Sequence, residues 1–163
     1  QSITYRRYLL MKKFAANYIL SESGLLLKNG ILIADDDGNV IKIIDTMGDL
    51  DETAQLVFLN GILIVNNLYI RKKSLDFAED ELTQFVSLKI NGHQQLSTSE
   101  LIEIAKQIQA EFSNLKTPEI TNSIYSLLNS YFNKENQAGI FLLVNSDLIG
   151  LHFKPQSKLK RIV

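Results

Sequence analysis

Short apolar runs separated by turn residues dominate residues 14–65, and this alternation constrains the fold more than any other feature. Five such runs, rich in Ile, Leu and Val, lie at 14–20, 31–34, 40–45, 55–59 and 62–65. Asp37-Gly38 separates two of them, and this dipeptide favours a tight hairpin because glycine adopts positive φ without a steric clash. Asn60-Gly61 predicts another turn. The pattern is typical of short strands in an antiparallel sheet or sandwich.

Two helices are predicted in the middle of the chain. Ser97-Thr98-Ser99-Glu100 has the residues of a capping box, in which the Ser hydroxyl and the Glu carboxylate bind free amides of the first turn. The apolar residues that follow recur at helical spacing: Leu101, Ile104, Ala105, Ile108, Phe112 and Leu115. Thr117-Pro118-Glu119 predicts the start of a second helix, over 118–132, because Thr caps, Pro suits the first turn and an acid suits the positive end.

The end of the chain returns to a strand pattern. Apolar runs at 139–144 and 148–153 flank Asn145-Ser146-Asp147, and a basic run follows at 154–161. That basic run is typical of a solvated terminal strand, with an anion-binding patch as the alternative. Because strands precede and follow the helices, we expect the last strands to join the first sheet.

The expected fold class is therefore α+β. It is an antiparallel β-sandwich built from N- and C-terminal strands, with two or three packed helices. We expect a single domain over 1–163, with the sandwich at 14–65 and 139–161 and a helical insertion at 75–133.

Charge and composition exclude several classes of protein. The chain has 17 basic and 18 acidic residues and a net charge of -1, whereas binding to nucleic acid or an anionic membrane needs a concentrated positive field. The absence of cysteine excludes disulfides, thiolate metal sites and cysteine nucleophiles. No apolar stretch reaches the ~18 residues of a membrane span. We therefore expect a cytoplasmic, soluble protein with no nucleic-acid or membrane partner.

Residues 25–33, 37–46 and 59–64, and later 139–143 with 158–161, carry a resemblance to a known family. They resemble the opening and the closing strands of the amidohydrolases, in particular the cytosine deaminase- and chlorohydrolase-like group of Bacteroidetes-type bacteria. The helical region from His93 to Asn133 resembles the last helices before the closing strands. The resemblance covers roughly 14–65 and, more loosely, 91–161. It implies the small composite β-sandwich that accompanies a metal-binding (β/α)8 barrel in the family.

The chain departs from the family where the metal site would begin. In the family, the third opening segment leads into a Pro-Gly turn and a His-x-His pair that binds metal. Here Arg71 and Lys73 fall at those positions, and a cation there would repel a divalent ion. A full barrel needs on the order of 200 residues, and far fewer separate Lys73 from the capping box at Ser97. The resemblance thus implies the sandwich without the barrel.

Other candidate sites have simpler structural interpretations. His93 and His152 are the two histidines, and we interpret His93 as a loop residue and His152 as a solvent-facing or rim residue, rather than metal ligands with Asp147. The run Asp35–Gly38 resembles a calcium loop but lacks its distal glutamate, so a hairpin turn is predicted. The acids of 76–81 fit the first turn of a solvated helix over 75–85 better than a catalytic carboxylate pair.

Two main functions follow from these interpretations, with a small-molecule pocket between sandwich and helices as a third. The first is a non-catalytic amidohydrolase-like protein with a binding or oligomerisation role, whose partner is a second copy or another protein. The alternative is an amidohydrolase-type hydrolase of carbon–nitrogen (non-peptide) bonds whose barrel is absent from this sequence or supplied by another chain. We predict no catalytic, cofactor-binding or metal-binding residues and no cofactor for this chain.

Overall fold

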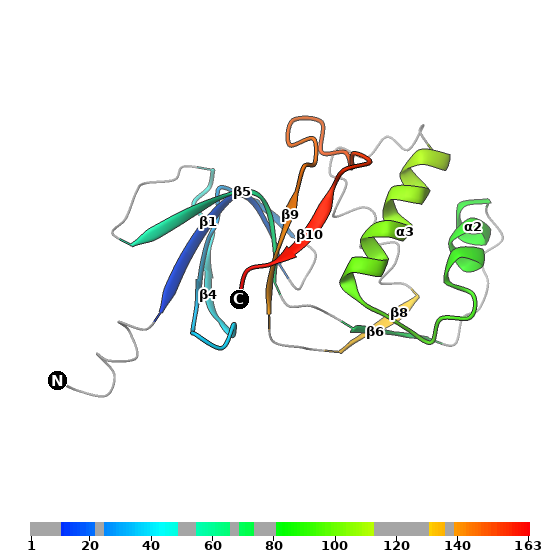
Figure 1. Cartoon of the computed structure of the whole chain (residues 1–163), viewed down its shortest axis with the longest axis horizontal. Helices are drawn as coiled ribbons and strands as arrows, with labels where there is room; N and C mark the ends of the chain where they lie inside the picture. The colour runs from blue at the N-terminus through cyan, green and yellow to red at the C-terminus, as the bar shows by residue number, and fades with distance from the viewer. Residues whose placement is uncertain are drawn as a thin grey trace.

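A mixed sheet of seven strands forms the centre of the computed structural model, which describes residues 11–21, 25–48, 55–65, 69–73, 81–112, 131–135 and 139–163 (Figure 1). Its strands follow the order β10-β9-β5-β1-β3-β4, with β2 paired to β1. They are β1 (Lys12–Leu20), β2 (Leu26–Lys28), β3 (Ile31–Ala34), β4 (Val40–Ile44), β5 (Leu56–Val65), β9 (Ile140–Val144) and β10 (Lys158–Arg161). The described residues thus define an α+β fold.

A second, smaller sheet and two helices lie between β5 and β9 in the sequence. The small sheet has the order β7-β6-β8, with β6 at Tyr69–Lys72, β7 at Gln95–Leu96 and β8 at Phe132–Glu135. The helices are α2 (Glu81–Ile90) and α3 (Thr98–Glu111). No helix of the described residues is both long and apolar enough to cross a membrane.

The two ends of the chain meet in one sheet, as predicted. β9 pairs antiparallel with β5, in a register that places Val65 opposite Ile140, and β10 pairs antiparallel with β9. The prediction of purely antiparallel pairing is wrong, because β1 and β5 run parallel. Apolar runs and turn signals locate strands, but strand direction here depends on how the chain crosses from β4 to the far side of β1.

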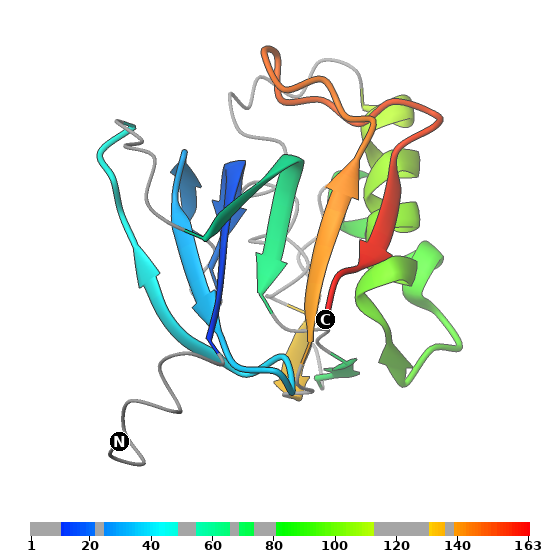
Figure 2. The same ribbon diagram turned by 60° about the vertical axis from the view of Figure 1, so that its left-hand side comes forward.

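The predicted turn at Asn60-Gly61 is also wrong, because both residues lie inside β5. The β1–β5 register shifts between Ala16 and Tyr18, and the side-chain Oδ1 of Asn17 accepts a hydrogen bond of 2.7 Å from the Gly61 amide. Gly61 has a φ of 148°, which favours glycine. The strand bends at this β-bulge, as Figure 2 shows.

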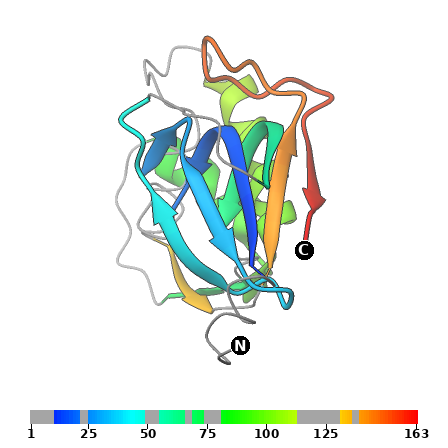
Figure 3. The same cartoon turned by 90° about the vertical axis from the view of Figure 1, so that its left-hand side faces the viewer.

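The curled sheet has a separate apolar core on each face. One core lies within the curl and consists of Phe14, Ala16, Ile19, Leu32, Ala34, Leu63, Val65, Ile140 and Leu142. The other joins the opposite face, through residues such as Ile62 and Leu143, to the buried sides of α2 and α3. Figure 3 shows the sheet in front of these helices. Alternation along β5 and β9 therefore supplies both cores.

The start of the first predicted helix is confirmed by α3, but its predicted end at 115 is wrong, because α3 ends at Glu111 and Phe112 is its C-cap. Ser97 is its N-cap, and the hydroxyl of Ser97 accepts a hydrogen bond of 3.3 Å from the amide of Glu100. The carboxylate of Glu100 accepts a bond from the Ser97 hydroxyl. The predicted helix over 75–85 is shifted, since α2 begins at Glu81 and residues 74–80 lie outside the described part.

The second predicted helix falls mainly on residues outside the described part. Its predicted end is wrong, because Phe132 begins β8. The predicted strand at 148–153 is a turn closed by an isolated bridge between Asp147 and His152. Leu151 has a φ of 55°, so this apolar run does not continue as a strand. The terminal strand lies in the basic run instead, at β10.

Gln109 connects α3 to the loop before β10. Its amide nitrogen donates to the carbonyl of Phe153 at 2.8 Å, and its amide oxygen accepts from the Phe153 amide at 2.9 Å. We expect Gln109→Ala to lower the free energy of unfolding by about 1–3 kcal/mol, because two partly buried backbone groups lose their partners. Urea denaturation measures this loss. Gln109→Glu, which keeps an acceptor but loses the donor, should also destabilise the chain, and wild-type stability of both variants would contradict the role of the contact.

Candidate functional site

The strand β5 has one side without a described partner in its first half. β1 pairs with β5 along residues 56–64, whereas β9 pairs only with residues 62–65. At the bend, β5 therefore diverges from β9 and leaves residues 56–60 with no described strand on that side. Unpaired N–H and C=O groups along such an edge can pair with another chain.

This edge lacks the charges that usually prevent strands from pairing with other molecules. Residues 56–60, Leu-Val-Phe-Leu-Asn, contain neither a charge nor a proline. The outer strands are protected by cations, with Lys42 on β4 and Lys158, Lys160 and Arg161 on β10. Val57 and Phe58 are adjacent and point to opposite faces, yet they are 51% and 49% exposed. Both faces of this half-strand are therefore available for contact.

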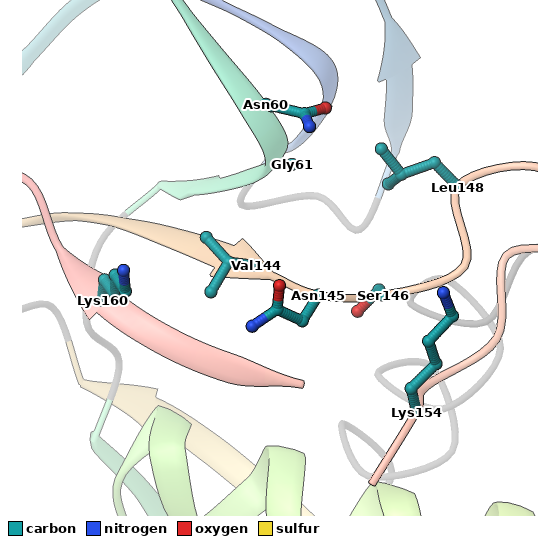
Figure 4. A pocket seen from close by; sticks show the side chains of 8 residues that line it. All are labelled: Asn60, Gly61, Val144, Asn145, Ser146, Leu148, Lys154 and Lys160. Carbon is teal, nitrogen blue, oxygen red and sulfur yellow. The ribbon is translucent and has the colours of Figure 1, made fainter. Parts of the chain in front are cut away.

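A cavity of about 430 Å³ lies in the fork between β5 and β9. Asn60 and Gly61 line it from the bend of β5, and the opposite side is formed by the end of β9, the loop after it and β10 (Figure 4). The lining residues on that side are Val144, Asn145, Ser146, Leu148, Lys154 and Lys160. We refer to these eight residues as the fork cavity.

Hydrogen bonds fix the loop that forms one wall of the fork cavity. The hydroxyl of the buried residue Ser157 donates to the carbonyl of Asn145 at 2.9 Å and accepts from the Lys154 amide at 2.9 Å. The hydroxyls of Ser146 and Ser157 lie 3.1 Å apart and are hydrogen bonded. Asn145 has a φ of 62°, which turns the chain out of β9. The positions of Asn145, Ser146 and Lys154 are thus set by this network.

The fork cavity is electrostatically positive. Lys154 and Lys160 line it. Within the described part of the chain no carboxylate lines it, and neither ammonium forms an ion pair. The nearby carboxylate of Asp147 binds the amides of Gly150 and Ile149, each at 3.0 Å. These bonds, with a smaller contribution from Lys154, hold the pKa of Asp147 below its usual value. The cavity therefore suits an anionic group that also accepts hydrogen bonds.

A second cavity, of about 350 Å³, lies beside the start of α3. It carries both signs of charge, because Lys89 lines it together with the carboxylates of Glu100 and Glu103. His93 Nδ1 lies 3.9 Å from a carboxylate oxygen of Glu100. Because two carboxylates line it beside Lys89, it does not present a net attraction for an anion comparable to that of the fork cavity.

The histidines lie where the sequence analysis placed them. His93 is an exposed loop residue between α2 and β7, which confirms that prediction, and His152 is exposed beside Asp147. Among the residues that the structure describes, no three His, Asp or Glu side chains gather as a metal site would require. Arg71 forms an ion pair with Glu135 between β6 and β8. Lys73 directly follows β6.

The acidic run after β3 is a hairpin turn, as predicted. One carboxylate oxygen of Asp35 accepts hydrogen bonds of 2.9 Å from the amides of Asp37 and Asn39. The bonds from Asn39, followed by the weaker ones from Asp37 and Gly38, lower the pKa of Asp35. Asp35 is thus used to close the turn. The acids at 76–80 lie outside the described residues.

The fork cavity was only partly visible in the sequence. The basic run 154–161 predicts a solvated terminal strand, with an anion-binding patch as the alternative, and β10 confirms the strand for residues 158–161. The sequence pattern does not reveal the contribution of Asn60 and Gly61, because Asn-Gly predicts a turn there and not the bend of a strand. One usable signal was the ten-residue β5 segment, whose lack of any charge is unusual for a strand with an open side.

Comparisons with known proteins add no family to this picture. No protein-family model matches the chain, and no curated protein matches it.

Proposed function

We propose that this chain is a non-catalytic, amidohydrolase-like protein that binds another polypeptide by adding one of its strands to the open side of β5. The observation that carries the proposal is the uncharged edge at residues 56–60, which has no described partner and exposes Val57 and Phe58. Strand addition supplies main-chain hydrogen bonds, and exposed apolar side chains add contact area. The added strand belongs to a second copy or to another protein.

The amidohydrolase part of the proposal is supported by the arrangement of the strands. The chain begins a curled sheet with β1–β5, leaves it for the helices, and returns with β9 and β10 to complete it. This is the order that the sequence resemblance implies for a composite sandwich. In place of a barrel, the sheet face that bears Ile62 and Leu143 is covered by α2 and α3. Through these contacts the helices stabilise the sheet.

Matched edge variants test the binding function. Val57→Lys places a charge on the open half of β5, and Ile41→Lys places the same charge at a similarly exposed position, 52% against 51%, on the outer strand β4. Self-association is measured by light scattering, and peptide binding by selection from a library of short extended peptides. We expect association of one kind or the other, with at least about a tenfold loss in Val57→Lys because an inserted charge blocks edge pairing.

The Ile41→Lys variant should associate as the wild-type chain does. Association that is absent from the wild-type chain, or equally sensitive to both variants, would contradict strand addition at β5. The non-catalytic part is tested separately. Metal-dependent hydrolysis of a carbon–nitrogen substrate by the purified chain, at a rate that follows its metal content, would contradict it.

A further inference from the structure

We infer that the fork cavity binds carboxylate side chains of the strand that adds to β5, so the bound segment is an extended peptide with apolar residues along most of its length and acidic ones at one end. The inference rests on the proposed function and names the chemistry of the partner. Asn60 belongs both to the open edge of β5 and to the lining of the cavity. A strand paired along residues 56–60 therefore runs directly into the fork.

The dimensions of the edge set the length of the segment. Five residues of an extended strand span about 17 Å. A peptide that pairs with residues 56–60 reaches the fork at its fifth or sixth residue, where the end of β9 at Val144 stops further pairing. Its next side chains enter the cavity, whose volume of about 430 Å³ accommodates a few side chains.

The charges of the cavity define the chemistry of those side chains. Lys154 and Lys160 are its charged residues, and neither is paired with a carboxylate of the described chain. Asn60, Asn145 and Ser146 supply amide and hydroxyl groups that hydrogen bond to oxygen atoms. Figure 4 shows the lysines on the side of the cavity opposite Asn60. A carboxylate between these groups gains charge-assisted hydrogen bonds, because no carboxylate of the described residues lines the site.

A peptide can contact both the exposed edge of β5 and the fork cavity, whereas a free anion can occupy the fork cavity alone. Inorganic phosphate or a small carboxylate would occupy the cavity but leave Val57 and Phe58 exposed. An extended chain covers these side chains with its apolar residues and places its acidic residues at the lysines. The surface lysines would then provide specificity for the acidic end rather than the main part of the affinity.

Isosteric peptides test the inference. Two fluorescent seven-residue peptides carry the same alternating Val and Thr residues and end in either Glu-Glu or Gln-Gln. A second pair carries Glu-Glu or Gln-Gln at the N-terminus instead, so that both parallel and antiparallel pairing with β5 are tested. Fluorescence anisotropy measures Kd at low salt. In one of the two directions we expect the Glu peptide to bind about tenfold more tightly than its Gln counterpart, which corresponds to two weakly screened ion pairs.

Variants of the lysines assign the effect to the cavity. The double variant Lys154→Gln/Lys160→Gln should bring the Glu peptide to the affinity of the Gln peptide, and 0.5 M salt should do the same through screening. Lys158→Gln is the matched control, because Lys158 is exposed on β10 but does not line the cavity. Thermal unfolding of all variants should be unchanged.

The outcomes separate the two proposals. Equal binding of Glu and Gln peptides, or a preference that is equally sensitive to Lys158→Gln, overturns the inference and leaves strand addition standing. Failure of all four peptides overturns the inference alone if the library or the second copy still binds at β5. Absence of any association at β5 overturns both.

Discussion

Gly61→Ala should lower the free energy of unfolding by about 3 kcal/mol or more. A Cβ atom at this position would lie 2.4 Å from the carbonyl oxygen of Leu143, which is backbone and cannot rotate away, and the φ of 148° is unfavourable for any residue with a side chain. The variant must therefore straighten β5, separate it from β9 or unfold. Urea denaturation monitored by circular dichroism measures the effect.

The control is Gly48→Ala, in the turn after β4. Gly48 also has a positive φ, 82°, but an added Cβ would meet no atom within 4 Å. The Gly48→Ala variant should therefore lose only the free energy of the unfavourable backbone conformation, about 1–2 kcal/mol. Similar losses in both variants would show that the close approach of β5 and β9 at the bend has no energetic importance. Asn17, whose side chain holds the Gly61 amide, would then also be dispensable.

Leu101→Ala should cost about 2–5 kcal/mol. Leu101 is fully buried in the core between α3 and the sheet, and its truncation removes apolar contacts and leaves a cavity. Gln107→Ala, on the exposed side of the same helix, should change the stability by no more than about 0.5 kcal/mol. Denaturant midpoints of the two variants measure the difference. A small loss for Leu101→Ala would mean that α3 is not part of the cooperative unit with the sheet.

Local signals in the sequence predicted the elements whose structure is decided locally. Ser97 and Glu100 fix the start of α3 through contacts within one helical turn. Asp35 closes its hairpin turn through bonds to residues two and four positions away. The strands β3 and β4 follow from the runs on either side of that turn. These features need no distant partner, so the sequence pattern is sufficient.

The incorrect predictions concern residues whose conformation depends on strands that are distant in the sequence. An Asn-Gly pair suits both a tight turn and a bulge. At Asn60-Gly61 the choice is made by Asn17 on β1 and by β9, neither of which is near in sequence. The run at 148–153 is apolar because Leu151 and Phe153 fill the core beside α3, not because it is a strand.

The candidate site could not be predicted for the same reason. The fork cavity exists only because β5 bends at Gly61 and because the Ser157 network positions the loop that carries Asn145, Ser146 and Lys154. The sequence showed the cations of the terminal run, but their relation to the open half of β5 arises from tertiary structure. The sequence shows which residues carry positive charge, but it does not show that they lie beside the open half of β5.

The pairing of β5 with β9 has a consequence for the synthesis of the protein. Val65 pairs with Ile140, which lies about 75 residues further along the chain, so the second side of β5 is paired only after that residue has been synthesised. On the ribosome, the uncharged strand at Leu56–Val65 therefore emerges long before its partner. During that interval the whole β9-facing side of this strand, rather than its first half alone, is open to intermolecular association, so nascent chains halted before β9 are the species most at risk of aggregation.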